Sequence, residues 1–301
     1  MTKVKAWISA FRLRTLPLAL SSIIMGGFLA AYYDAFNWII FLLASLTTLF
    51  LQVLSNLAND YGDTVNGADH EERKGPARMV QSGLIALKSM RHAIVLFSIL
   101  SFITGLALIV IAFGSANALL SLLFILLGIA AIAAAMKYTM GNNPYGYNGL
   151  GDFYVLLFFG LVGVAGSFYL YMHEIRWEVL LPASSVGFLS AGVLNLNNMR
   201  DEQSDKMANK NTLVVKKGIN WAKKYHYSLV VGALLLSFVF VLFGELTAYK
   251  LLFLLSLPLF IRHLIVVNKA KESKAFDPEL KKLALSTLIY VILFGVGLIL
   301  G

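Results

Sequence analysis

Nine long apolar stretches dominate this sequence and constrain its fold more than any other feature. A helix needs roughly 20 mostly apolar residues to cross the hydrocarbon core of a bilayer. The stretches cover residues 15–33, 38–58, 92–113, 117–138, 153–172, 179–198, 226–244, 248–267 and 283–300. Of the 301 residues, 58% are hydrophobic and only 14% are charged, a composition typical of polytopic membrane proteins. The sequence therefore predicts an all-α fold with nine transmembrane helices, forming a single integral-membrane domain over residues 1–301.

The Lys and Arg residues are distributed unevenly among the loops between these stretches. If the N-terminus lies inside, only Arg176 and Lys250 of the 25 basic residues fall on the outer side. Basic residues collect on the cytoplasmic side of membrane proteins, so we expect a cytoplasmic N-terminus. The formal charge of +9 follows from this topology and indicates no nucleic-acid partner. Because the chain has no Cys, disulfides, thiolate metal sites and cysteine nucleophiles are excluded.

Two clusters of Asn and Asp follow apolar stretches on the predicted cytoplasmic side. The first is NLANDYGD at residues 56–63 and the second is NNMRDEQSD at residues 197–205. On a helix, their spacings of four and then three or four residues place each set on one face. Carboxylates near membrane depth usually serve a function, and hard oxygen donors suit Mg²⁺. The predicted metal ligands are Asn56, Asp60, Asp63, Asn197, Asp201 and Asp205, with all four Asp residues also catalytic, and Asp69 and Asn198 are auxiliary candidates.

The second cluster repeats the first one four apolar stretches later and in the same orientation. This repetition predicts two related helical halves around a central cavity that opens at the cytoplasmic side. Basic side chains near the clusters could neutralise a diphosphate leaving group; the candidates are Arg14, Arg78, Lys137, Arg200 and Lys210. Tyr138 and Tyr145 could stabilise a cation through their ring faces, whereas Tyr147 fits an interfacial aromatic belt at least as well. Together these features indicate an enzyme acting on a lipid diphosphate.

Four sequence motifs resemble those of the UbiA superfamily of intramembrane aromatic prenyltransferases. They are NLANDYGD with the trailing NGAD at residues 66–69, GP at 75–76 followed by QSG at 81–83, PYGYNGLGD at 144–152, and LNNMRD at 196–201 with KNTL at 210–213. The third and fourth motifs resemble the branch that prenylates 1,4-dihydroxy-2-naphthoate in menaquinone biosynthesis. Relatives often have a basic residue before PYG, where this chain has Asn143, which leaves Lys137 as the basic candidate nearby.

The resemblance implies a reaction, a cofactor and a cellular location. Two Mg²⁺ ions would bridge the two Asp clusters and the diphosphate of a polyprenyl diphosphate. Loss of diphosphate would leave an allylic cation at the prenyl C1. The dihydroxynaphthoate ring would attack this cation at the carbon that bears the carboxylate, and carbon dioxide would leave to give demethylmenaquinone. The implied location is the bacterial cytoplasmic (inner) membrane, with the active site facing the cytoplasm and no obligate protein partner.

Other functions fit parts of the same pattern. The Asp clusters would serve equally a related enzyme that uses 4-hydroxybenzoate, homogentisate or a haem as the acceptor. A cation-coupled transporter would also use intramembrane carboxylates, but here they gather at one face instead of the midplane, and no inverted repeat is apparent. A purely structural role explains the doubled Asp clusters least well. The prenyl chain length and the oligomeric state do not follow from the sequence.

Overall fold

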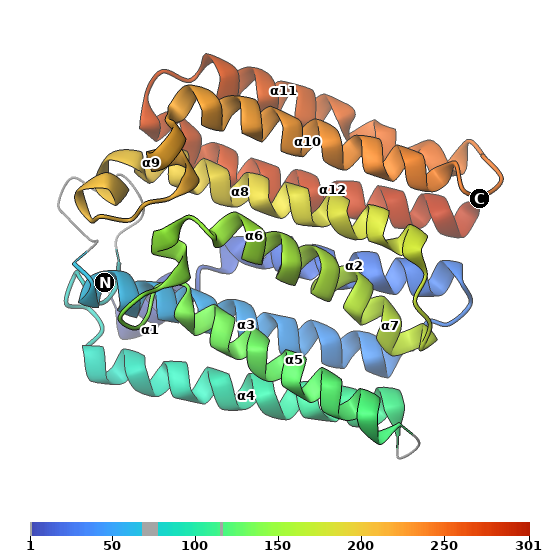
Figure 1. Cartoon of the computed structure of the whole chain (residues 1–301), viewed down its shortest axis with the longest axis horizontal. Helices are drawn as coiled ribbons and strands as arrows, with labels where there is room; N and C mark the ends of the chain where they lie inside the picture. Colours follow the sequence, from blue (N-terminus) through green and yellow to red (C-terminus); the bar gives the residue numbers. More distant parts are fainter. Residues whose placement is uncertain (1, 68–77, 115–116) are drawn as a thin grey trace.

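The computed structural model describes residues 2–67, 78–114 and 117–301, and over these residues it is helical with no strand. The helices run roughly along the long axis of the molecule (Figure 1). The first half contains α1 (Lys3–Phe11), η1 (Leu13–Thr15), α2 (Leu16–Tyr32), α3 (Trp38–Val65), α4 (Leu87–Phe113), α5 (Ala118–Lys137), η2 (Tyr145–Asn148), α6 (Gly151–Val155), η3 (Leu156–Gly166) and α7 (Ser167–Met172). The second half contains η4 (Trp177–Val179), α8 (Leu180–Met207), α9 (Leu213–Lys217), α10 (Ile219–Val241), η5 (Tyr249–Ser256), α11 (Leu257–Lys269), η6 (Ser273–Phe276) and α12 (Asp277–Leu300).

Within the described residues, nine helical segments are long and apolar enough to cross a membrane, which confirms the predicted number of spans. The clearest differences lie at the ends of α3 and α8, which were expected near residues 58 and 198. These helices continue to Val65 and Met207. Both acidic clusters therefore lie within the last turns of a helix instead of after it. The reason is tertiary, because the polar side chains in these turns are buried against partners from other segments, as described below.

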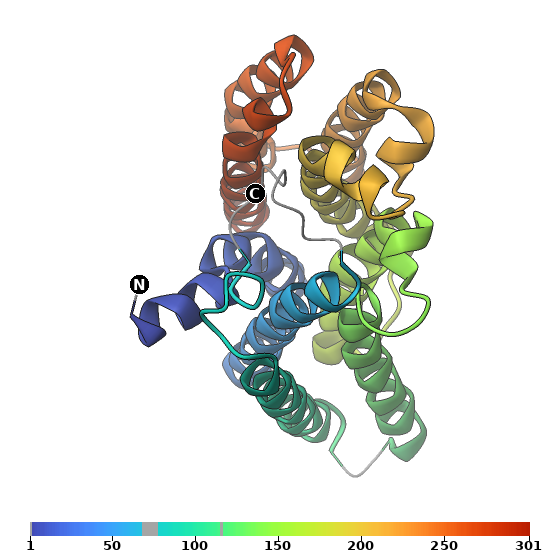
Figure 2. The same ribbon diagram turned by 90° about the vertical axis from the view of Figure 1, so that its left-hand side faces the viewer.

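The acidic ends of α3 and α8 lie at the same end of the molecule. Figure 2 views this end, where α9 and the N-terminus are also found. Around the end of α3, a hydrophobic cluster joins α1, α3 and α4 through Ala6, Ala10, Leu54, Leu57 and Met90. Fully buried apolar side chains of this kind fix the position of α3 at the point where its carboxylates begin. The common end confirms that the clusters share one face of the bundle, while the relatedness of the two halves stays a prediction.

The fifth span contains a π-helical segment that the sequence pattern did not predict. Eleven residues of η3 adopt this wider helix between α6 and α7. Gly160 in η3 lies so close to α8 that an added Cβ would be 2.7 Å from Ala183 O and 3.0 Å from Gly187 Cα. Small residues allow such close backbone approach between membrane helices. π-Helices are rare and often accompany functional sites, and residues of this segment line the cavity described below.

Replacing Gly160 with Ala is expected to destabilise the protein by about 1–3 kcal/mol, the usual cost of inserting a methyl group into a packed interior. The added methyl would press on the backbone of α8, which cannot move aside as a side-chain end could. The measurement is the thermal unfolding midpoint in detergent. Gly128→Ala is the matched control, because an added Cβ there meets no described atom within 4 Å. Equal midpoints for the two variants would contradict this account of the contact.

Candidate active site

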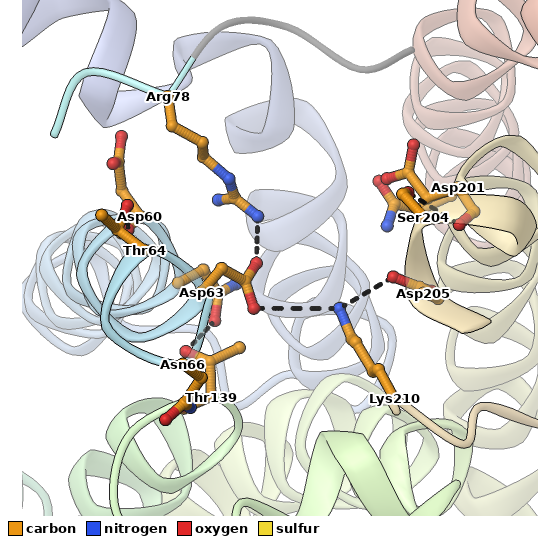
Figure 3. Close-up of polar contacts among 12 residues, drawn as sticks. Asp60, Asp63, Thr64, Asn66, Arg78, Thr139, Asp201, Ser204, Asp205 and Lys210 are labelled. Carbon is orange, nitrogen blue, oxygen red and sulfur yellow. Dashed lines mark hydrogen bonds and ion pairs between the residues drawn. The ribbon is translucent and has the colours of Figure 1, made fainter. Parts of the chain in front are cut away.

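Asp63 is the most highly connected carboxylate of the first acidic cluster. It is 3% exposed and forms an ion pair with Arg78. The Tyr147 hydroxyl donates to Asp63 Oδ1 at 3.0 Å, and Lys210 Nζ lies 3.9 Å from the same oxygen. Figure 3 shows Asp63 between Arg78 and Lys210. The Asp63 carboxylate, on α3, therefore contacts both Arg78, which precedes α4, and Lys210, which follows α8.

Asp60 binds backbone amides, whereas Asp63 of the same cluster binds basic side chains. Asp60 Oδ2 accepts a hydrogen bond from Met79 N at 2.9 Å, and Asp60 Oδ1 accepts one from Val80 N at 3.2 Å. These bonds hold the chain immediately after Arg78, the partner of Asp63. Figure 3 shows Asp60 on the side of Asp63 that is remote from Lys210. In this arrangement Asp60 supports the position of Arg78 instead of facing the second cluster.

Asn56 likewise makes contacts within the first half of the chain. Its side-chain nitrogen donates to Phe11 O at 2.9 Å and to Thr15 Oγ1 at 3.1 Å. These bonds tie the corner between α1 and α2 to α3. The sequence predicted that Asn56, Asp60 and Asp63 form one metal-binding face. In the structure they have different partners, and among the described contacts only Asp63 is linked to the second cluster, through Lys210.

The second acidic cluster is organised by Arg200. Its guanidinium binds Asp201 through two hydrogen bonds, from Nε at 2.8 Å and from Nη2 at 2.7 Å. The Nη2 atom also donates to Asn197 Oδ1 at 2.8 Å, and Nη1 donates to Asp277 Oδ1 at 2.6 Å. Fork-shaped Arg–carboxylate pairs are strong and directional. Arg200 thereby joins the end of α8 to the start of α12.

Lys210 joins the two acidic clusters. Its Nζ lies 3.6 Å from Asp205 Oδ1 and 3.9 Å from Asp63 Oδ1. The ammonium also stands 5.5 Å from the ring centroid of Tyr147 and 6.0 Å from that of Tyr138. Burial on its own would lower the pKa of Lys210, but the carboxylates of Asp63 and Asp205 outweigh it and raise the pKa above its usual value. Lys210 is therefore a buried cation between carboxylates of α3 and α8 (Figure 3).

Several predicted site residues lie outside this network. Arg14 and Lys137 are exposed on the surface, so the buried Lys210, instead of Lys137, supplies the lysine nearest to both clusters. Tyr145 is partly buried, and its hydroxyl donates to Ala134 O at 2.9 Å. Asp69, together with the GP at residues 75–76, lies outside the described residues.

Two residues of the site were not predicted from the sequence. Tyr147, which also fitted an interfacial belt, bonds to Asp63, and burial followed by the nearby Asp63 charge raises its pKa. The signal was its place in the PYGYNGLGD motif. Asp277 had no such signal, because it resembles an ordinary charge at the start of a helix, and only the packing of α12 brings it to Arg200.

The buried oxygens of α8 provide a test of whether a divalent cation fits the site. Among the described residues, no three acidic or His side chains are grouped closely enough to hold a metal, and Asp63, Asp201 and Asp205 are each paired with a basic residue. However, Asp205 Oδ2 and Asn198 Oδ1 are buried with no hydrogen-bond partner in the described part of the chain. Buried polar atoms are usually satisfied, and oxygen donors of this type are those that Mg²⁺ prefers. The end of α8 therefore offers buried oxygen donors of the type that suits a hard divalent cation.

A cavity of about 350 Å³ extends from the site into the first half of the bundle. Tyr138 and Asn59 line it near the acidic clusters, and Leu170 and Phe124 line it farther along the helices. The remaining lining residues are mostly apolar and come from α2, α3, α4, α5, the span that contains η3 and, through Leu194, α8. Such a cavity can enclose an apolar chain whose polar end reaches the charged cluster.

Three tyrosines contact one another along the wall of this cavity, with Tyr138 and Tyr145 meeting edge to face and Tyr145 stacked on Tyr154. The ring centroids of Tyr138 and Tyr145 are 5.4 Å apart, and those of Tyr145 and Tyr154 are 4.0 Å apart. All three residues line the cavity. Aromatic faces attract cations, so this wall can stabilise positive charge that develops next to the carboxylate cluster.

Comparisons with known proteins agree with this architecture along the whole chain. A family model described as the UbiA prenyltransferase family matches residues 19–298. A 1,4-dihydroxy-2-naphthoate octaprenyltransferase from Haemophilus influenzae is 42% identical over 301 residues, covering 99% of this chain and 97% of its own. The enzyme of the same name from Escherichia coli is 41% identical, covering 100% and 97%.

Solved structures show the same fold at lower sequence identity. A UbiA homolog from Aeropyrum pernix has a TM-score of 0.67 at 16% identity, covering 96% of this chain and 98% of its own. A homolog from Archaeoglobus fulgidus bound to DMAPP and Mg²⁺ has a TM-score of 0.63 at 17% identity, covering 95% and 98%. The match to the family model and the full-length identity to curated relatives show that this chain belongs to the UbiA prenyltransferase family.

Proposed function

We propose that this protein transfers a polyprenyl group from polyprenyl diphosphate to 1,4-dihydroxy-2-naphthoate, with loss of carbon dioxide and diphosphate, to give demethylmenaquinol, the reduced form of demethylmenaquinone. The observation that carries this proposal is the position of Lys210, which joins Asp63 to Asp205 beside a long apolar cavity. Full-length relatives at 33–42% identity, named 1,4-dihydroxy-2-naphthoate octaprenyltransferases, support the choice of acceptor. The whole chain, residues 1–301, would act as one integral-membrane domain.

The donor would lie with its apolar chain in the cavity and its diphosphate at the charged cluster. Tyr138 both lines the cavity and stands 6.0 Å from Lys210 Nζ, which marks the point where apolar and charged surroundings meet. Arg78, Arg200 and Lys210 each neutralise a carboxylate in this structure. The same three cations can instead bind phosphate oxygens, for which Arg forks and Lys ammonium groups are well suited.

The carboxylates of both helices would hold the metal that the reaction uses. Asp63, Asp201 and Asp205 would bind Mg²⁺, with Asn198 supplying a neutral oxygen. When bound, Mg²⁺ polarises phosphate oxygens and neutralises the charge that develops on them. Asp60 would act on the site indirectly, by holding the backbone beside Arg78.

The chain's own residues account for the separation of charge during the reaction. As the bond between the prenyl C1 and the diphosphate oxygen breaks, its electron pair stays with the diphosphate, next to Arg78, Arg200 and Lys210. The positive charge left on C1 would face the rings of Tyr138 and Tyr145. The electron-rich naphthoate ring then forms the new carbon–carbon bond, and the displaced carboxylate leaves as carbon dioxide.

We place the site on the cytoplasmic side of a bacterial cytoplasmic membrane, with the N-terminus on the same side.

Replacing Tyr147 with Phe is expected to raise the Mg²⁺ concentration for half-maximal transfer by about tenfold, the lower end of the effect of removing a group that orients a metal-binding residue. The change deletes the hydroxyl that bonds to Asp63 and leaves the ring in place. The measurement is the initial transfer rate over a series of Mg²⁺ concentrations. Tyr227→Phe serves as the control, since Tyr227 is 58% exposed and remote in the sequence from both clusters. If the Mg²⁺ concentration for half-maximal transfer were unchanged in Tyr147→Phe, Tyr147 would have no role in metal binding.

The proposed function is tested by offering one prenyl diphosphate with three acceptors to the purified protein in detergent. The acceptors are 1,4-dihydroxy-2-naphthoate, 4-hydroxybenzoate and homogentisate, each with Mg²⁺ and with Mg²⁺ removed by a chelator. We expect prenylated product and carbon dioxide with dihydroxynaphthoate only, and none after chelation. Product from another acceptor would overturn the proposed acceptor. Absence of product with all three acceptors, from protein shown to be folded, would overturn the proposed activity.

A further inference from the structure

A second cavity lies at the end of the bundle opposite the acidic clusters. It has a volume of about 210 Å³, and its polar lining includes Tyr32, Tyr33, Glu178 and Lys250. These residues come from the end of α2 and from segments before α8 and after α10 (Figure 1). Of all the basic residues in the sequence, only Arg176 and Lys250 were expected on the outer side, and both lie at this cavity or against its wall.

Lys250 is a buried cation with little to compensate its charge. It is 4% exposed, and its Nζ donates to Glu245 O at 2.9 Å and to the Tyr32 hydroxyl at 3.3 Å. No carboxylate of the described residues lies within ion-pairing distance of it. Burying an unpaired charge is costly, and ionisable groups at membrane depth generally mark a binding function. A cation in this position calls for an anion from outside the chain.

The hydrogen bonds around Lys250 leave donors available for such an anion. An ammonium group carries three protons, and the hydrogen bonds from Lys250 to Tyr32 and Glu245 use two of them. Because the Tyr32 oxygen accepts from Lys250, its own proton stays available to donate. Two donors therefore lie 3.3 Å apart on one wall of the cavity, a spacing that two oxygens of one oxyanion can match.

The acidic residue in the cavity wall does not cancel this positive charge. Glu178 Oε1 accepts from the Tyr33 hydroxyl at 3.2 Å and lies 3.8 Å from Arg176 Nη1. Arg176 in turn stands 4.4 Å from the centroid of the Tyr33 ring. The Glu178 charge is thus held by its own partners. Asp34, Glu174 and Glu245 are also near this end in the sequence, but their side chains are exposed, where water and salt screen them.

We propose that this cavity binds a phosphate-type oxyanion through Lys250 Nζ and the Tyr32 hydroxyl. The shared chemistry is a tetrahedral phosphorus with negatively charged oxygens, as in a phospholipid head group or in free phosphate. On the cytoplasmic side of membranes, basic pockets between helices bind lipid head groups, and Lys250 offers the same chemistry at this opposite end of the bundle. Trp177, which lines the cavity and is 60% exposed, is a residue type that settles at head-group level. This site is separate from the proposed transfer reaction and does not depend on it.

The test uses the full-length protein after its lipids have been exchanged for a non-ionic detergent. The thermal unfolding midpoint is followed while phosphatidylglycerol, diacylglycerol without phosphate, or inorganic phosphate is added in separate titrations. We expect stabilisation by phosphatidylglycerol and none by diacylglycerol. A response to inorganic phosphate as well would show that free phosphate also occupies the site. A response to phosphatidylglycerol alone would show that the lipid part contributes to binding.

Lys250→Gln is expected to raise the phosphatidylglycerol concentration needed for half of the stabilisation by about tenfold. This is the scale of one lost hydrogen bond to a charged group. Lys271→Gln is the matched control, because Lys271 is exposed and lies outside the cavity lining, and its response should equal that of the wild type. If Lys250→Gln fails to fold, Tyr32→Phe replaces it, with a smaller loss expected. The proposal is overturned if neither phosphatidylglycerol nor inorganic phosphate stabilises the wild type. It is also overturned if the folded Lys250→Gln or Tyr32→Phe protein responds to phosphatidylglycerol as the wild type does.

Discussion

Replacing Asp205 with Asn is expected to lower the rate of prenyl transfer on the order of 100-fold or more, as when a single charge-stabilising group is removed from an active site. Asn has almost the same shape as Asp, so the change removes charge with little loss of packing. Asp205 pairs with Lys210 through Oδ1, while its Oδ2 is buried with no hydrogen-bond partner among the described residues. That second oxygen is the one we assign to Mg²⁺, so the loss should be accompanied by a higher Mg²⁺ requirement.

The transfer rate of Asp205→Asn is best measured at several Mg²⁺ concentrations and saturating prenyl diphosphate. Glu202→Gln is the matched control, because it removes one carboxylate from the same turns of α8, and Glu202 forms no contact with the Asp63–Lys210–Asp205 group in the described residues. The control should retain wild-type activity. If Asp205→Asn also retained it at low Mg²⁺, the assignment of Asp205 as a metal ligand would be wrong.

Replacing Lys210 with Met is expected to destabilise the metal-free protein by about 3–5 kcal/mol, the usual effect of removing one partner from a buried ion pair. The change leaves the carboxylates of Asp63 and Asp205 facing each other without the ammonium between them. Their repulsion should be relieved by a divalent cation. We therefore expect Mg²⁺ to raise the unfolding midpoint of this variant more than that of the wild type.

The same Lys210 variant should also use the donor poorly, because a cation near the diphosphate is lost. The expected result is a higher KM for prenyl diphosphate together with a lower kcat. Lys206→Met is the control, since Lys206 is on the same end of α8 but is exposed. A Lys210→Met protein with wild-type stability and an unchanged KM would remove Lys210 from both the structural and the donor-binding role.

The number and order of the spans could be predicted from the sequence because burial in lipid acts on each residue independently of its tertiary neighbours. A stretch of apolar residues is long enough to cross the bilayer or it is not, and the nine predicted stretches correspond to nine helical segments of the described chain. The ends of α3 and α8 could not be predicted in the same way. Hydropathy falls at residues 58 and 198, yet the helices continue, because their polar side chains find buried partners.

The π-helical segment η3 shows the same limitation within a span. Its residues are apolar throughout, so hydropathy predicts a membrane helix but gives no information on the helix type. The close contacts of Gly160 with α8 and of Gly163 with Ser22 on α2 arise only when three helices pack together. The glycines in the sequence were compatible with this packing, although they did not require it.

The residue types of the candidate site were predictable, whereas their roles were not. The spacing of Asn56, Asp60 and Asp63 placed them on one helix face. In the structure, however, Asp60 accepts hydrogen bonds from backbone amides, whereas Asp63 lies next to Lys210. Arg200 was expected at the second cluster, and the structure adds Asp277 as its partner from a segment far along the chain. Such pairings depend on which helices are neighbours.

By itself the sequence determined that this protein spans a membrane, that its carboxylates and cations gather at one end, and that oxygen donors suited to Mg²⁺ are among them. These properties follow from residue chemistry and from spacing along a single helix, both of which are local. Only the tertiary structure decided that Lys210 joins Asp63 to Asp205, that Tyr147 bonds to Asp63, and that Lys250 is buried at the opposite end. The contacts of Asp63 with Lys210 and with Tyr147 join segments that are distant in sequence. They and the burial of Lys250 depend on how the whole bundle packs.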